Sequence, residues 1–414
     1  MSKVKHIPQG YKDSPLGIIP KEWEVKRLGE LCTKIGSGVT PRGGQNVYLS
    51  QGRPFLRSQN VANGYLLLDD VVFIDEITHQ KQKSTEIELD DVLLNITGAS
   101  IGRSAVATSE IVGGNVNQHV CIIRLKDKTL SYYICAFLLS YIGQKQIDSY
   151  QAGGNREGLN YDQIASFKIF IPSSKEIIQI WNFLSLWDTA IEKQSELIEK
   201  LKLRKRALMQ QLLTGKKRLP GFSGEWEEVK LGDVFDERNE TNRDDLPLLS
   251  ITGDKGVIYQ SDSDKRDISN DDKSKYKRIC PNDIGYNTMR MWQGRSALSE
   301  LEGIVSPAYT IVTPRENVNV EFMAMLIQQP RVVYDFWTHS QGLVSDTLNC
   351  KYPDFSQVKV RIPTKQEQTA IAFVLVKADK EIELAKDKLA NLQSQKRGLM
   401  QQLLTGKKRI KNIE

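Results

Sequence analysis

Two stretches of the chain carry apolar residues at alternating steps of four and three, which is the spacing of a coiled-coil seam. The stretches are 180–212 and 371–403, and neither contains a proline. Their main seam residues are Ile180, Leu184, Ile191, Leu201 and Leu208 in the first stretch, and Ile371, Leu375, Ile382, Leu392 and Leu399 in the second. Because both seams have the same pattern, we expect two long helices that pair with each other in antiparallel fashion.

The ends of these helices are also marked in the sequence. Each stretch runs into Thr-Gly-Lys-Lys-Arg, where Gly215 and Gly406 suit a helix C-cap and the bases suit a helix C-terminus. The predicted helices therefore cover about 173–214 and 364–405. A helix of about 40 residues spans roughly 60 Å at about 1.5 Å per residue.

Lys205 and Lys396 interrupt the two seams at the same position. A polar residue in a seam can set the helix register or mark a contact with a partner. Alternatively, the stem of each lysine bends outward and places the charge in water. Both interpretations are open at this point.

The regions before each helix have a different pattern, rich in β-branched residues with frequent Gly, Asn and Asp. Short apolar runs predict strands at 69–74, 119–125, 167–172, 309–314 and 358–363. Longer helical patterns lie at 130–147 and 320–337. Each region is therefore expected to form a mixed α+β domain.

The chain is an internal duplication. Residues 208–218 read LMQQLLTGKKR, and residues 399–409 repeat all eleven letters. Two further pairs of segments match: WEVKRLGEL with WEEVKLGDV, beginning at Trp23 and Trp226, and DVLLNITGASIGRSAV with DIGYNTMRMWQGRSAL, beginning at Asp91 and Asp283. The repeat unit is a whole domain plus a helix, which excludes short-period repeat folds.

These patterns predict an α+β fold with an internal pseudo-two-fold repeat. Two similar globular domains, here called head 1 and head 2, are separated by two long antiparallel, coiled-coil-like helices. The predicted segments are 1–22, an N-terminal segment packing near the second repeat; 23–172, head 1; 173–218, the first spacer helix; 219–363, head 2; and 364–414, the second spacer helix and tail.

Composition narrows the possible functions. The net charge of +6 permits nucleic-acid binding without requiring it. The five cysteines are scattered without a C-x-x-C pair, so neither a disulfide framework nor a metal site is expected. There is no long apolar stretch and no apolar leader segment, which favours the cytoplasm.

Motifs for catalysis are also missing. The GKK sequences after Gly215 and Gly406 lack the upstream Gly and the Ser or Thr of a phosphate-binding loop. No Asn/Asp-Pro-Pro-aromatic motif of an adenine methyltransferase is present, and no hydrolase triad is visible. These absences favour a protein that is not an enzyme and holds no cofactor itself.

The order of the motifs, taken twice, resembles the specificity (S, HsdS) subunits of type I restriction-modification systems along essentially the whole chain. The motifs that carry this resemblance are KDSPLGIIPKEWE at 12–24, LPGFSGEWE at 219–227, SGVTP at 37–41, DVLLNITGASIGRSAV at 91–106, GLNYDQIASFKIFIP at 158–172 and the two LMQQLLTGKKR helix ends. The second half departs from the pattern, because 237–256 has no SGVTP match and TMRMW replaces glycines at 288–292. Such divergence is expected if the two heads read different DNA.

The resemblance implies a function in DNA recognition. Each head would be a target-recognition domain that reads one half of a bipartite, asymmetric double-stranded DNA site, and the helices would fix the gap and dock the partner subunits. The implied partners are two methyltransferase (M) subunits and restriction (R) subunits. S-adenosylmethionine, ATP and Mg would bind to those partners and not to this chain.

Base reading requires Arg, Lys, Asn and Gln side chains that reach base edges, mainly in the major groove. In head 1 the predicted DNA-binding residues are Arg57, Gln59, Asn60, Arg103, Asn117, Gln118, Asn155 and Arg156. In head 2 they are Lys255, Arg290, Trp292, Arg295, Tyr309 and Gln341. Arg103 and Arg295 recur in both heads, which favours a role in the fold or on a phosphate over the reading of one base.

Three other interpretations are open. The chain could serve a related type II-like or other defence methylation system, since the partners define the system. An enzyme fused to two recognition domains would need catalytic motifs that the sequence lacks. A coiled-coil scaffold without DNA would explain the helices but not two divergent, loop-rich heads.

Overall fold

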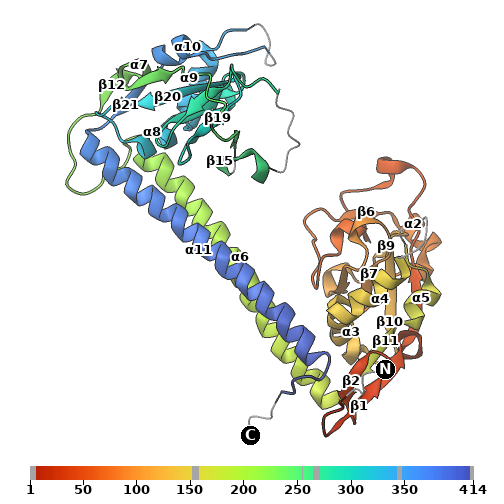
Figure 1. The fold of residues 1–414 in the computed structure, drawn as a ribbon. Coiled ribbons are helices and arrows are strands. Elements are labelled where there is room, and N and C mark those ends of the chain that lie inside the picture. The colour runs from red at the N-terminus through yellow and green to blue at the C-terminus, as the bar shows by residue number, and fades with distance from the viewer. Residues whose placement is uncertain (1–5, 152–157, 254, 264–270, 343–346, 411–414) are drawn as a thin grey trace. The chain divides into compact units, whose positions relative to one another are not determined.

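The computed structural model describes residues 6–151, 158–253, 255–263, 271–342 and 347–410. The chain divides into two compact units (Figure 1). Unit 1 contains Met1–Gln194 and Lys388–Glu414, and unit 2 contains Ser195–Asp387. Each unit therefore holds one head together with a part of both long helices.

Head 1 is built around a four-stranded antiparallel sheet in the order β4-β10-β7-β8. The strands are β4 (Cys32–Ser37), β10 (Val120–Leu125), β7 (Val92–Asn95) and β8 (Ser104–Val106). Alternate side chains enter two different cores, because Leu94 and Ile123 belong to one cluster and Leu93 and Ile122 to another. Both faces of the sheet are thus buried, which explains the continuous apolar runs in its central strands.

The remaining strands of unit 1 form separate, smaller sheets. A three-stranded sheet in the order β6-β5-β9 contains the parallel pair β5·β9. The elements are β1 (Tyr11–Ser14), β2 (Gly17–Pro20), β3 (Glu24–Arg27), α1 (Leu28–Leu31), β5 (Arg53–Leu56), β6 (Val72–Ile74), α2 (Glu76–Lys81), β9 (Asn115–Val116), α3 (Ser131–Leu139), α4 (Tyr141–Gln151), α5 (Tyr161–Ser166) and β11 (Lys168–Ile171). β3 pairs with β11, so the strand that opens head 1 lies beside the strand that closes it.

Head 2 repeats the four-stranded sheet, in the order β13-β20-β17-β18, and the closing pair β12·β21. The elements are β12 (Glu227–Lys230), α7 (Leu231–Val234), β13 (Phe235–Arg238), β17 (Ile284–Asn287), β18 (Ser296–Leu298), β20 (Tyr309–Pro314), α8 (Val320–Leu326), α9 (Pro330–His339), α10 (Tyr352–Gln357) and β21 (Lys359–Ile362). Two small sheets stand where head 1 has its three-stranded sheet. They pair β14 (Leu249–Thr252) with β15 (Gly256–Tyr259), and β16 (Lys277–Ile279) with β19 (Gly303–Val305).

The long helices are α6 (Ser174–Leu212) and α11 (Lys365–Leu403), each of 39 residues. In both units the segments of the two helices lie side by side (Figure 1). All predicted seam residues are buried or half-buried. In unit 2, Leu212 shares a core with Ile371, whereas in unit 1, Leu403 shares a core with Ile180. The predicted antiparallel pairing is therefore confirmed.

The two seam lysines form ion pairs with the other helix. Lys205 donates to Asp379 within unit 2, and Lys396 donates to Asp188 within unit 1. The two pairs are equivalent, because 396 − 205 and 379 − 188 both equal the repeat offset of 191. The lysine side chains are only 23% and 16% exposed. Of the two interpretations of these lysines, a role in the helix register agrees with this geometry.

The segment that follows each long helix contacts the first turn of the other long helix. Gly215 and Gly406 both have φ of 68° and terminate the helices as predicted. Beyond them, Arg218 donates twice to Glu367 with distances of 2.6 Å, and Arg409 contacts Glu176, the equivalent residue. A buried carboxylate at the start of each helix is thus neutralised by an arginine beyond the end of the other.

The N-terminal hairpin β1-β2 completes this junction in unit 1. The Tyr11 hydroxyl donates to the carbonyl oxygen of Gly406 at 3.0 Å, and Trp23 Nε1 donates to Glu176 at 2.9 Å. The hairpin therefore contacts the C-terminal end of α11.

The predicted strands at 119–125, 167–172, 309–314 and 358–363 correspond to β10, β11, β20 and β21, and β6 occupies the end of the run at 69–74. Each of the two longer helical patterns is divided into two helices. In head 1 the break falls at Ser140, whose ψ of 162° is extended, and in head 2 it falls before Pro330.

Candidate nucleic-acid interface

Head 2 contains a groove of about 730 Å³ at the end of strand β17. Four predicted DNA-binding residues line it, namely Lys255, Arg290, Arg295 and Tyr309. They come from the β14–β15 turn, the β17–β18 turn and the start of β20. The fold therefore brings together residues that lie more than 50 positions apart in the sequence.

The β17–β18 turn holds the two arginines on a fixed backbone. Asn287 N–H donates to the Arg295 carbonyl at 3.1 Å, and Arg290 N–H donates to the Asn287 carbonyl at 2.9 Å. Gly294 takes a positive φ of 73°, and Met291 is fully buried beneath the turn. The backbone positions of both arginines are thus set by hydrogen bonds and packing.

The side chains of Arg290 and Arg295 are exposed, and neither forms a hydrogen bond or ion pair with the described residues. Two other polar side chains of the groove lining, by contrast, are hydrogen-bonded to the backbone of the fold. The Tyr309 hydroxyl donates to the Ile251 carbonyl at 3.3 Å, and Gln328 Nε2 donates to the Ser296 carbonyl at 2.9 Å. The groove thus combines a fixed lining with two guanidinium groups available for a ligand.

The two remaining predicted residues of head 2 have internal partners. Trp292 is half-buried, and its Nε1 donates to the Met289 carbonyl within the same turn at 3.0 Å. Gln341 lies outside the lining of the groove, and its Nε2 donates to Asp354 at 2.9 Å. Trp292 therefore braces the turn that carries Arg290.

In head 1, three predicted residues meet at one aspartate. Asn60 is fully buried and donates to Asp70 Oδ1 at 2.7 Å, while Arg57 Nη2 donates to the Asp70 carbonyl at 3.0 Å. Gln59 donates to the same carboxylate. These side chains lie together after β5, and each of them donates a hydrogen bond to Asp70.

A second group of head 1 residues forms a chain of contacts across the sheet end. Gln118 accepts from Thr40 and contacts His119 Nε2 at 3.1 Å, and His119 Nδ1 contacts Thr97. Asn117 is buried, and its Oδ1 accepts from the His119 N–H at 3.1 Å. Thr40 and His119 were not predicted as site residues. Thr40 lies inside the SGVTP motif at 37–41, and this motif was the sequence signal that could have indicated it.

The two groups in head 1 belong to one end of the sheet. Asn95, at the end of β7, donates to the Ser58 carbonyl at 2.8 Å, and Asn117 N–H donates to the Leu56 carbonyl at 2.9 Å. Arg103 is exposed on the turn after β7. The predicted residues Asn155 and Arg156 lie outside the described residues.

Arg103 and Arg295 occupy equivalent positions. Each follows a glycine of positive φ, 84° at Gly102 and 73° at Gly294. The carbonyl of Arg103 accepts from the N–H of Asn95 at 2.8 Å, as that of Arg295 accepts from Asn287. Both side chains are exposed, so the shared frame presents one arginine at the same place in each head.

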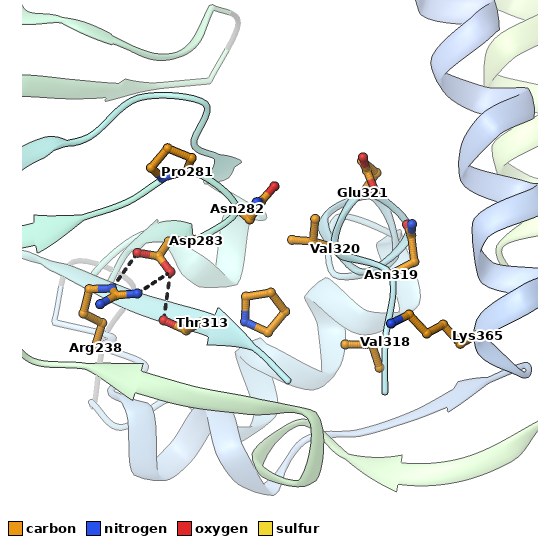
Figure 2. Close-up of a pocket in the computed structure, with 11 residues that line it drawn as sticks. Arg238, Pro281, Asn282, Asp283, Thr313, Val318, Asn319, Val320, Glu321 and Lys365 are labelled. Carbon is orange, nitrogen blue, oxygen red and sulfur yellow. Dashed lines mark hydrogen bonds and ion pairs between the residues drawn. The ribbon is translucent and has the colours of Figure 1, made fainter. Parts of the chain in front are cut away.

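At the opposite end of the head 2 sheet, an arginine and an aspartate are paired with each other instead of being free for a ligand. Figure 2 shows a hollow of about 430 Å³ between the starts of β17, α8 and α11, where Arg238, Asp283 and Thr313 point toward one another. Arg238 donates to both carboxylate oxygens of Asp283 at 2.7 and 3.3 Å, and Thr313 donates at 2.8 Å. The hydrogen bond with Asp283 raises the pKa of Arg238. Because these charges neutralise each other, Arg238 and Asp283 are paired within the fold and are not available to a ligand.

The cysteines lack the features of reactive thiols. Burial raises the pKa of Cys121 and Cys350 to about 12 and that of Cys135 to about 11, which keeps the thiols protonated at neutral pH. Within the described ranges, no group of three or more His, Cys, Asp or Glu residues could hold a metal ion. None of the described helices is long and apolar enough to cross a membrane.

Two heads with one frame and different loop ends, joined to a pair of matched helices, define a duplicated, two-headed protein. The family described as "Type I restriction modification DNA specificity domain" matches residues 20–203 and 223–394, once in each half. The chain belongs to this family.

Similar proteins carry the same designation. A putative type I restriction enzyme MjaX specificity subunit from Methanocaldococcus jannaschii is 23% identical, with 97% of each chain covered. The type I restriction enzyme MjaVIII specificity subunit of the same organism is 22% identical, with 95% of each covered.

Solved structures share the fold at low sequence identity. The HsdS subunit from Thermoanaerobacter tengcongensis matches with a TM-score of 0.51 and 15% identity over 95% of this chain and 99% of that one. A chain from a structural study of the assembly and conformational transition of the type I R-M system matches with a TM-score of 0.56 and 15% identity, over 94% and 99% of the two chains. The predicted fold class and family are confirmed.

Proposed function

We propose that each head reads one half of a bipartite, asymmetric DNA site, and that the chain itself performs no catalysis. The observation that carries this proposal is the contrast between the heads. Both keep the same four-stranded sheet and the same arginine after β7 and β17, but the side chains on their loop ends differ. A duplicated frame with divergent loop ends is what a protein needs to read two different sequences on one duplex.

The charge on the loop ends supports binding to the DNA backbone. Arg103 and Arg295 are exposed without internal partners among the described residues, so they can neutralise phosphates without first breaking an ion pair. Binding by such contacts releases counterions, and the affinity then falls steeply as salt is added.

The long helices are proposed to set the gap between the half-sites and to dock two methyltransferase subunits, with restriction subunits joining the complex. Several large apolar residues on α6 and α11 remain exposed, which supports a protein partner on these helices. They are Ile178, Leu186, Leu197, Leu203, Phe373, Val376 and Leu384. S-adenosylmethionine, ATP and Mg would be supplied by those partner chains.

A second candidate is the specificity chain of a type II-like or other defence methylation system. The fold is compatible with both, because the heads and helices would do the same work with different partners. Co-purification of the chain with the subunits encoded beside it distinguishes the two.

The proposal is tested by single-molecule methylome sequencing of cells that express the chain with its methyltransferase, compared with cells that lack only this chain. We expect a split adenine-methylated motif that disappears with the chain. If methylation is unchanged and the co-purified complex binds no DNA with sequence preference, the proposal fails.

A further inference from the structure

A comparison of the β7–β8 turn of head 1 with the β17–β18 turn of head 2 identifies one arginine that is present only in the head 2 turn. Residues 91–106 and 283–298 align without a gap, and the turn in each segment leads into the same Gly-Arg-Ser-Ala sequence. Within the turn, head 1 has Gly98, Ala99 and Ser100, where head 2 has Arg290, Met291 and Trp292. Each turn contains a short 3₁₀ helix, at Gly98–Ser100 in head 1 and one residue later at Met291–Gln293 in head 2. The backbone also differs inside the turn, because Gly98 has a positive φ of 70° and Arg290 a φ of −130°. The equivalent hydrogen bonds of Asn95 to Arg103 and of Asn287 to Arg295 close both turns in the same way.

This pairing acts as an internal control for the roles of the two arginines in the groove. The phosphate backbone is the same in both half-sites, whereas the bases differ. A cation at the same place in both heads therefore suits a phosphate, and a cation found in only one head suits a base. Arg295 has its counterpart in Arg103, but the counterpart of Arg290 is Gly98.

We propose that Arg290 reads a guanine in the half-site of head 2, and that Arg103 and Arg295 contact phosphates in their own half-sites. This inference rests on the proposed function and adds the identity of a base to it. The planar guanidinium can donate two parallel hydrogen bonds to O6 and N7 of guanine in the major groove, which no other base pair accepts in that arrangement.

The structure around Arg290 suits such a reading role. A base-reading side chain needs a backbone that is held in place and a terminal group that is available to the base. The backbone of Arg290 is held by the hydrogen bond of its N–H to the Asn287 carbonyl, by the burial of Met291 and by the hydrogen bond of Trp292 Nε1 to the Met289 carbonyl. The Arg290 side chain is exposed in the groove, and its guanidinium group has no ion pair within the described part of the chain.

Other polar residues of the groove are less suited to select a base. The Tyr309 hydroxyl and the Gln328 amide are engaged with carbonyls of the fold. Lys255 presents a single compact charge, which matches a phosphate as readily as a base edge. Arg290 is therefore the residue whose loss is expected to change the recognised sequence.

The test uses the chain co-expressed with its methyltransferase, and compares wild type with R290A, R290K and R295A. We read the methylated motif by methylome sequencing and measure binding to duplexes that differ at one position of the head 2 half-site. R290A should relax the requirement for one guanine by about 5- to 150-fold and leave the other half-site unchanged. R290K should relax it too, because the charge remains but the two-pronged contact is lost.

R295A is the matched control from the same turn. It should weaken binding to all duplexes alike, keep the motif, and lower the salt dependence, −d log K/d log [salt], by about 1. If R290A keeps full discrimination at every position, or weakens all duplexes equally as R295A should, the assignment of Arg290 is overturned. Failure of the proposed function is distinct, because then the wild-type complex itself would show no split motif.

Discussion

The two heads neutralise an equivalent buried aspartate with arginines from different strands. In head 1, Arg124 of β10 donates to both oxygens of Asp91 at 2.8 Å. In head 2, Arg238 of β13 performs this task for Asp283. The register of the sheets places Thr313 where head 1 has Arg124, and Thr313 also donates to Asp283. Both heads therefore neutralise a carboxylate at this strand end, with a cation from the adjacent strand in head 1 and from the strand beyond it in head 2.

At the loop ends the heads differ in a more consequential way. Head 1 joins its amide groups to Asp70 and to the contacts of His119, so its polar surface is organised before any ligand arrives. Head 2 leaves Arg290 and Arg295 exposed in a groove. One sheet can therefore support two kinds of recognition surface, because the strand ends set the backbone and the loop residues set the chemistry.

The largest effect is expected from lengthening the helices that both heads share. Seven residues inserted at the centre of α6 and seven at the centre of α11 would add about 10 Å, or roughly 3 base pairs. The Lys205–Asp379 and Lys396–Asp188 pairs stay in register, because each lies on one side of the insertions. We expect methylome sequencing to show unchanged half-sites with a longer gap.

Insertion into α6 alone is the control. It shifts one half of α6 against α11, so the two lysine–aspartate pairs can no longer form together, and the complex should lose site-specific methylation. A gap that stays the same after the paired insertion would contradict the role of the helices as a spacer.

The next effect concerns the aspartate–arginine pairs at the strand ends. R124M and R238M each leave a buried carboxylate without its cation, and should lower the local free energy of opening by about 3 kcal/mol. Amide hydrogen exchange on the complex should report this loss only in the sheet of the altered head. R124K and R238K are the controls, and should restore much of the protection. Equal loss in both sheets from one substitution would show that the heads do not have separate cores.

A smaller effect is expected from the arginines that the heads share. R103A should lower the salt dependence of DNA binding by about 1 and leave the methylated motif unchanged, because we assign Arg103 to a phosphate. The double variant R103A/R295A should lower it by about 2. A change of the preferred base in either half-site after R103A would break the equivalence of the two positions.

The smallest effect is expected at the seam lysines. K205E should destabilise the helix pair by up to about 1 kcal/mol, since Asp379 is half exposed and the pair is partly solvated. The reversed pair K205D/D379K should recover most of that loss in urea unfolding of the complex. K205M tests whether the ion pair is needed for the helix register. If K205M leaves the stability unchanged or raises it, the apolar seam residues alone set the register.

The helices were the most predictable part of the fold. Their period of alternating threes and fours and the glycines at 215 and 406 depend on local sequence, and the observed ends at Leu212 and Leu403 lie within two residues of those predicted. The ion pairs of Lys205 and Lys396 were not predictable, because Asp188 and Asp379 lie outside the seam and the pairing needs the register of the partner helix.

The candidate site was predictable in its residue types but not in their surroundings. Arg290 and Arg295 were predicted because arginine is a residue type that reaches base edges and phosphates, and the duplication further showed that Arg295 recurs as Arg103. The burial of Asn60 was not predictable, since an amide that holds a turn and an amide that reads a base have the same sequence signature. Its partner Asp70 comes from a loop ten residues away, and only the folded sheet brings the two together.

The most direct test of the central claim, that each head reads its own half-site, is methylome sequencing of a chimera. Residues 219–363 would be replaced by the matching segment of another specificity subunit of known site, with both long helices kept from this chain. We expect the head 1 half-site and the gap to persist while the other half-site becomes that of the donor. A motif that changes in both halves, or in neither, would contradict the account.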